Sequence, residues 1–126
     1  MMWCVATPRQ LTSSDRCAVR AAALDALIRV DEQIASLTRI FDDIVEAALL
    51  VSTDDEHDPE GSTIAFERSQ VSSLLREARA DKKALQQTFD RVEDTTFGIC
   101  ERCHGFIGVE RLLALPVTTR CVECAR

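Results

Sequence analysis

The sequence predicts a mainly α-helical protein, with a long antiparallel helical hairpin, or coiled coil, that carries an acidic tip and precedes a small four-cysteine domain. Three observations support this fold class. The 126 residues include only four glycines and three prolines, two long stretches contain neither, and four of the six cysteines form two close pairs near the C-terminus. So few turn-forming residues disfavour an all-β sandwich or barrel.

The first stretch without glycine or proline lies between Pro8 and Pro59. Apolar residues recur in it with alternating steps of three and four, which is the a/d spacing of a coiled-coil seam. We therefore expect one long helix, for which Thr12, Ser13 and Ser14 are candidate N-caps. The seam consists of Leu27, Val30, Ile34, Leu37, Phe41, Ile44, Ala48 and Val51.

The second such stretch, between Gly61 and Gly98, continues the same spacing and predicts a second long helix. Asp58, Pro59 and Glu60 are suitable N-cap, N1 and N2 residues, and we expect Gly98 to end the helix. Two seam positions are basic, and their long aliphatic stems can lie along an apolar surface. The seam consists of Ile64, Arg68, Val71, Leu75, Ala78, Lys82, Leu85, Phe89 and Val92.

The connection between the two predicted helices, roughly residues 53–58, is short enough to fold them back on one another. At 1.5 Å per residue the hairpin would be about 50 Å long. The alternative is one chain of an intermolecular coiled coil. We predict an N-terminal arm at 1–11, the hairpin at 12–97 with its tip at about 53–61, and a C4 zinc-finger domain at 98–126.

Two C-x2-C pairs, Cys100 with Cys103 and Cys121 with Cys124, are separated by 17 residues. This spacing is typical of a structural zinc site. Four thiolates fill the tetrahedral shell of Zn²⁺ and leave no position for a reactive water, so we predict one structural ion and no catalytic residues. Because the segment is short, we expect the metal to supply its folding energy. Two disulfides, a redox pair, or His104 as a ligand are the alternatives.

The net charge of −6 is concentrated near the predicted tip. Five acidic residues lie between Asp54 and Glu60, and residues 47–67 contain no lysine or arginine. Nucleic-acid binding by counterion release needs the opposite charge, so we expect no direct DNA binding and instead a basic or metal-bearing partner. The alternative is a solvated turn. We find no membrane-spanning run and no secretory signal, and expect a cytoplasmic protein.

These features together resemble the DksA/TraR family of bacterial transcription regulators. The resemblance covers roughly residues 20–126 and is most specific in the cysteine segment. The residues that carry it are the acidic stretch 55–60, the junction Val92-Glu93-Asp94-Thr95-Thr96-Phe97-Gly98-Ile99-Cys100, the four cysteines at their spacing, and Ile107-Gly108, Arg111-Leu112 and Pro116 between the pairs.

The resemblance implies a protein that binds RNA polymerase rather than DNA. In the family the hairpin enters the secondary channel, acidic tip residues approach the catalytic Mg²⁺ region, and initiation is modulated. The family tip reads D-x-x-D-x-A; here Asp55 and Asp58 match, and Glu60 stands where alanine is expected. We take these three residues as the candidate partner-binding tip.

Family members often act together with guanosine tetraphosphate, which is therefore a candidate partner. The basic residues that would bind it cannot be matched one by one. Lys82, Lys83 and Arg91 are the candidates, and solvated helix charges are the favoured interpretation of them. The alternative function for the whole chain is a non-enzymatic adaptor, a coiled coil stapled by zinc that binds another protein.

Overall fold

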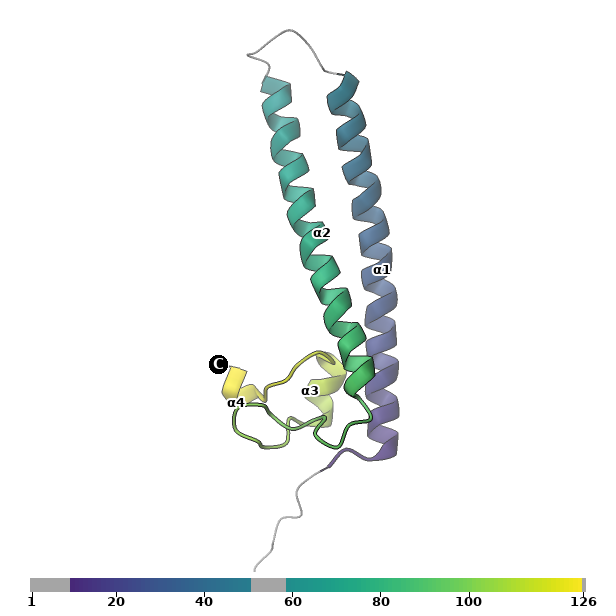
Figure 1. The fold of residues 1–126 in the computed structure, drawn as a ribbon, viewed down its shortest axis with the longest axis vertical. Coiled ribbons are helices and arrows are strands. Elements are labelled where there is room, and N and C mark those ends of the chain that lie inside the picture. Colours follow the sequence, from purple (N-terminus) through teal and green to yellow (C-terminus); the bar gives the residue numbers. More distant parts are fainter. Residues whose placement is uncertain (1–9, 51–58, 126) are drawn as a thin grey trace, which may run out of the picture. The chain divides into compact units, whose positions relative to one another are not determined.

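The structure, a computed structural model, describes residues 10–50 and 59–125 and is mainly helical, as predicted (Figure 1). Two long helices, α1 (Ser13–Leu50) and α2 (Pro59–Arg91), are followed by the short α3 (Val109–Ala114) and α4 (Val122–Ala125). Within the part described, the only β-type pairing is an antiparallel bridge between Ile99 and Phe106. No helix among these residues has the length and apolar character needed to cross a membrane.

α1 begins with a reciprocal cap. The backbone N–H of Asp15 donates to the Thr12 hydroxyl at 3.0 Å, and the Thr12 N–H donates to the Asp15 carboxylate at 3.0 Å. Both groups would otherwise lack a partner at a helix start. Of the three candidate caps, Thr12 is therefore the N-cap, whereas Ser13 and Ser14 lie inside the first turn.

The contacts divide the chain into two compact units. One, which we call the hairpin unit, is Ile28–Lys83. Residues 28–50 of α1 and 59–83 of α2 run antiparallel in it, which confirms the predicted hairpin (Figure 1). Leu75 and Ala78 are its buried seam residues. The seam residues of α1 in this unit are only half-buried, because a two-helix seam is open on both flanks.

The polar seam position at Lys82 behaves as expected of a long basic side chain. Its ammonium group reaches the Asp31 carboxylate on α1 at 2.8 Å, while both side chains remain partly exposed. A pair of this kind contributes at most about 1 kcal/mol. The Lys82–Asp31 pair thus connects α2 to α1 within the hairpin unit, at a position where the apolar pattern of the seam is interrupted.

The second unit, which we call the cysteine unit, contains the chain up to Leu27 and from Ala84 onward. Its core combines residues of the N-terminal part of α1 with the segment that follows α2. Val19 and Ala23 of α1 are fully buried, although the predicted seam began only at Leu27. The core cluster consists of Leu11, Val19, Val92, Phe97, Cys100, Ile107 and Leu112.

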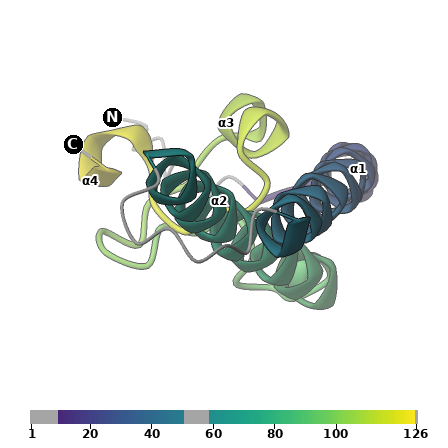
Figure 2. The same cartoon turned by 90° about the horizontal axis from the view of Figure 1, so that it is seen from above.

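This core changes the expectation that a metal alone holds the C-terminal segment. Phe97, Ile107 and Leu112 bury apolar surface against α1 and the end of α2, so the segment shares a hydrophobic core with the hairpin base. Figures 1 and 2 show α3 and α4 as separate short helices joined by the stretch 115–121.

α2 ends at Arg91, ahead of the predicted end at Gly98. Arg16 of α1 donates to the carbonyl of Val92 and, at 2.9 Å, to that of Asp94. These contacts satisfy carbonyl groups that a longer helix would have used, and a series of turns replaces the last helical turns. Arg20 also pairs with Glu93 at 2.6 Å. Side chains of α1 thus determine where α2 stops.

Gly98 lies in the junction between α2 and the cysteines, where the backbone conformation and the close packing both require a glycine. Its φ of +89° is unfavourable for other residues, and an added Cβ would lie 2.9 Å from the Leu11 Cδ1 atom. We expect Gly98→Ala to lower the free energy of unfolding by about 1–3 kcal/mol, measured by chemical denaturation.

Gly61→Ala is the matched control, since nothing lies within 4 Å of the added Cβ in α2. It should leave stability unchanged or raise it by up to about 1 kcal/mol. Equal effects of the two substitutions would contradict this account of Gly98.

Candidate metal centre

The first cysteine pair lies on a tight loop directly after the Gly98 turn. The loop is closed by two backbone bonds, from the Cys100 N–H to the Gly105 carbonyl at 2.8 Å and from the His104 N–H to the Cys100 carbonyl at 3.0 Å. The Gly105 N–H lies 3.4 Å from the Cys103 Sγ atom, to which it donates. A Cβ at Gly105 would lie 3.3 Å from the same sulfur, so the loop has little room for a side chain.

The second cysteine pair lies at the single turn of α4 (Val122–Ala125): Cys121 directly precedes the turn and Cys124 lies in it. The N–H groups of Cys124 and Ala125 donate to the Cys121 carbonyl at 3.2 and 3.0 Å. Residues three apart on a helical turn lie on one face, so this turn directs both thiols of the pair the same way.

All four thiols converge, as the spacing predicted. The four Sγ atoms lie within 4.8 Å of one another, and those of Cys103 and Cys121 are 3.7 Å apart. A tetrahedral ZnS₄ group with bonds of about 2.3 Å has S···S edges of about 3.8 Å. A disulfide would need about 2.05 Å. The cysteines are free thiols at a spacing that fits one tetrahedral zinc ion and does not fit disulfides.

The surroundings of the thiols differ. Cys100 is fully buried in the core cluster, Cys121 and Cys124 are half-buried, and Cys103 is exposed. Backbone N–H groups of Cys103 and Cys121 lower the pKa of Cys100 to about 6. The hydrogen bond with the Cys121 thiol, with desolvation, raises the pKa of Cys124 to about 12. Four adjacent thiols therefore do not ionise together on their own, and a cation bound by all four displaces the remaining protons.

His104 takes no part in the cluster. It is exposed and has a φ of +60°, as expected of a residue in a tight loop turn. Among the residues described, the one group of histidine, cysteine and carboxylate side chains close enough to share a metal is Cys100, Cys103, Cys121 and Cys124. The geometry supports a C4 set without the histidine.

Contacts outside the four cysteines also shape the centre. Thr88 of α2 is buried, with its hydroxyl 3.0 Å from the Ala84 carbonyl and 3.3 Å from that of Pro116 between the cysteine pairs. Arg111 of α3 donates to the carbonyl of Arg120, next to Cys121, at 2.9 Å. Arg111 and Pro116 had been noted through the family resemblance, whereas the contacts of Thr88 had no signal.

The remaining candidates from the sequence are the acidic tip residues and the basic residues of α2. Asp55 and Asp58 lie outside the residues described, and Glu60 is the second residue of α2. Their partner-binding role stays a prediction. Of the basic candidates, Lys82 is paired with Asp31, Lys83 is exposed, and Arg91 is the last residue of α2.

Comparison with known proteins points to one family. Residues 96–126 match the model of the prokaryotic dksA/traR C4-type zinc finger. A 63-residue stretch, 48% of this chain, is 35% identical to the RNA polymerase-binding transcription factor DksA of Escherichia coli K12. A 42-residue stretch, 33% of this chain and 28% of the relative, is 38% identical to the protein of the same name in Buchnera aphidicola.

The fold has a solved counterpart in the transcription factor DksA2 of Pseudomonas aeruginosa, with a TM-score of 0.74, 19% identity and coverage of 91% of this chain and 83% of that one. The match to the E. coli protein spans 42% of that protein's length. The C4-type match and the convergence of the four thiols support one structural zinc ion. The zinc-finger match and the sequence relatives both resemble the DksA/TraR family, and the fold is that of the solved DksA2 structure.

Proposed function

We propose that this protein is a zinc-containing transcription regulator that binds RNA polymerase and modulates initiation. The observation that carries the proposal is the 63-residue similarity to a protein named as an RNA polymerase-binding transcription factor. The regulator would act in the cytoplasm, where the polymerase works, and would contact the enzyme rather than DNA.

The charge distribution supports a protein partner. The chain is acidic overall, and its acidic residues are most concentrated between Asp54 and Glu60. A phosphate backbone would repel such a segment, whereas a basic channel wall or a bound divalent ion would attract it. We propose that the hairpin enters the secondary channel of the polymerase and that Asp55, Asp58 and Glu60 form the contact at its tip.

The zinc site has a supporting role in this proposal. We propose that Cys100, Cys103, Cys121 and Cys124 are the four ligands of one ion, whose closed shell leaves no place for substrate. Through Cys100 the ion would stabilise the core that the C-terminal segment shares with the base of α1. The site would thus hold the cysteine unit together while the hairpin contacts the polymerase.

We propose guanosine tetraphosphate as a second partner, because the resemblance to the family implies it. Of the three basic candidates, Lys82 already has a carboxylate partner in Asp31, which leaves Lys83 and Arg91 as the better candidates. Transcription measured with and without the alarmone decides whether it belongs to the mechanism.

The first test is binding. A tagged full-length protein should retain purified core RNA polymerase, and the complex should withstand competition by non-specific DNA, since the contact is with the enzyme. Surface immobilisation of the protein gives the dissociation constant. Failure to bind polymerase, together with tight binding to a different protein, would favour the adaptor alternative.

The second test concerns the tip. Asp55→Asn keeps size and hydrogen bonding but removes one of five clustered charges, so the melting temperature should stay the same or rise as repulsion falls. We expect polymerase binding to weaken modestly and the effect on initiation in vitro to fall sharply.

Asp25→Asn, an exposed position on α1, removes the same charge far along the sequence from the tip and is the control. If Asp55→Asn regulates initiation as well as Asp25→Asn does, the acidic segment is a solvated turn and the tip role is wrong.

The third test removes a ligand. Cys103 is exposed, so Cys103→Ser alters metal binding with little direct effect on the core. We expect zinc content, measured by native mass spectrometry, to fall from one ion per chain to nearly none. Residues 98–126 should lose part of their amide protection, since the apolar core remains, while the hairpin stays helical by circular dichroism. Cys17→Ser, at an exposed free thiol of α1, should keep the ion; equal zinc contents in the two variants would exclude Cys103 as a ligand.

A further inference from the structure

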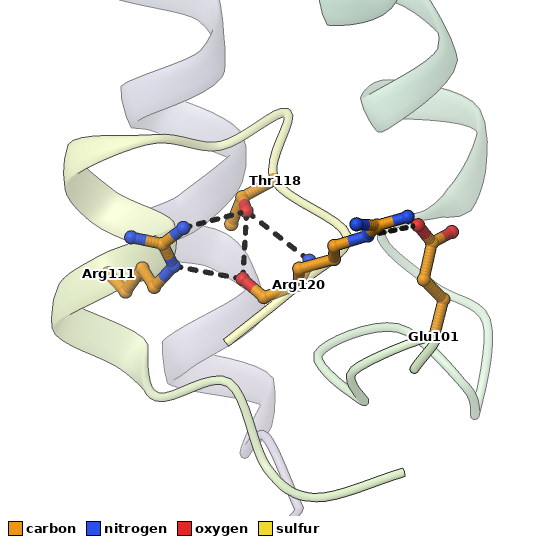
Figure 3. A network of polar contacts seen from close by, with 4 residues as sticks. All are labelled: Glu101, Arg111, Thr118 and Arg120. Atoms are coloured by element: carbon orange, nitrogen blue, oxygen red, sulfur yellow. Dashed lines mark hydrogen bonds and ion pairs between the residues drawn. The ribbon is translucent and has the colours of Figure 1, made fainter. Parts of the chain in front are cut away.

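The two cysteine pairs are also connected by polar contacts that include no cysteine side chain. Figure 3 shows the four residues involved, which we call the Arg111 network: Glu101, Arg111, Thr118 and Arg120. Glu101 lies in the loop of the first pair, Arg111 in α3, and Thr118 and Arg120 in the stretch that leads to Cys121. The network therefore spans all three segments that surround the metal site.

The network holds the backbone of the residue next to a ligand. Arg111 Nε donates to the Arg120 carbonyl at 2.9 Å, and Arg111 Nη2 donates to the Thr118 hydroxyl at 3.4 Å. The same hydroxyl donates to the Arg120 carbonyl at 3.0 Å and accepts the Arg120 N–H at 3.4 Å. Both backbone polar groups of Arg120 are thus bound, and Cys121 follows directly.

A second set of contacts joins this backbone to the first cysteine pair. Arg120 Nε lies 2.9 Å from the Glu101 carboxylate, and the Glu101 N–H donates to the Thr119 carbonyl at 2.9 Å. Glu101 follows Cys100 directly in the chain. One side-chain contact and one backbone contact therefore connect the segments that carry the two pairs.

We propose that Arg111 is a positioning residue for the zinc site, and that its network holds the two cysteine pairs at tetrahedral separation before the metal binds. The pairs are 17 residues apart in the sequence, and ordering the chain between them opposes metal binding. A framework that is already ordered removes much of this cost from the binding step. The network then determines how tightly zinc is held, independently of whether polymerase is the partner.

An effect of Arg111 on zinc affinity could also come from its charge alone. Four thiolates with one Zn²⁺ carry a net charge of −2, which any nearby arginine would offset. Arg102 separates the two explanations. It lies between Cys100 and Cys103, is exposed, and takes no part in the network. Positioning predicts that Arg111→Met weakens zinc binding and Arg102→Met does not. Charge compensation predicts similar losses for both.

The experiment measures zinc transfer from the intact loaded protein to excess chromophoric chelator, together with the competition equilibrium. We expect Arg111→Met and Thr118→Val to weaken zinc affinity by about 10- to 100-fold, the usual effect of removing contacts that orient metal ligands. Arg111→Lys keeps the charge but cannot reproduce the planar fork, so it should resemble Arg111→Met. Arg102→Met should retain the affinity of the parent protein.

Cobalt absorption separates positioning from general unfolding. At saturating Co²⁺, Thr118→Val should still show the spectrum of a tetrahedral four-thiolate site, because its ligands and core are unchanged and only the metal concentration needed is higher. Thr118→Val is the deciding variant, since it removes one hydroxyl and little else. Parent-like zinc affinity in Thr118→Val overturns the proposal, as does an equal loss of affinity in Arg102→Met and Arg111→Met.

Discussion

The structure depends most on Cys100, which belongs at once to the thiol cluster and to the apolar core. Its sulfur lies with those of Cys103, Cys121 and Cys124, and its side chain packs in the cluster that contains Val19 and Leu112. Metal coordination and hydrophobic burial thus act through one side chain. For a segment of about 30 residues, the two contributions together give a more stable fold than the apolar core alone.

This shared core explains how the short C-terminal segment is attached to the long helices. Arg16 and Arg20 of α1 bind the chain just after α2, and Thr88 of α2 lies within hydrogen-bond distance of Pro116 between the cysteine pairs. The attachment combines apolar contacts with hydrogen bonds to backbone carbonyls. The carbonyls of Val92 and Asp94, just beyond the end of α2 at Arg91, accept from Arg16, and that of Pro116 accepts from Thr88.

Local rules in the sequence were enough to predict much of this fold. The a/d spacing predicted both helices, Thr12 was among the expected caps, and the cysteine spacing predicted the cluster. The end of α2 was predicted too late, because it depends on Arg16, which lies 78 residues from Asp94 in the chain. The burial of Val19 and the Arg111 network likewise depend on segments that meet only in the folded protein. The acidic tip remains a prediction from sequence.

The half-buried seam has a consequence for motion on slow timescales. Amide hydrogens exchange through local openings whose free energy reflects the apolar surface that each opening exposes. In the hairpin unit, Leu75 and Ala78 are the buried seam residues, whereas the cysteine unit has a fuller core. Exchange should therefore be faster in residues 28–50 and 59–83 than near Val19 and Val92. A protein that covers those helices would slow their exchange most, so of the described parts of the two units the less protected one is also the more sensitive reporter of a partner.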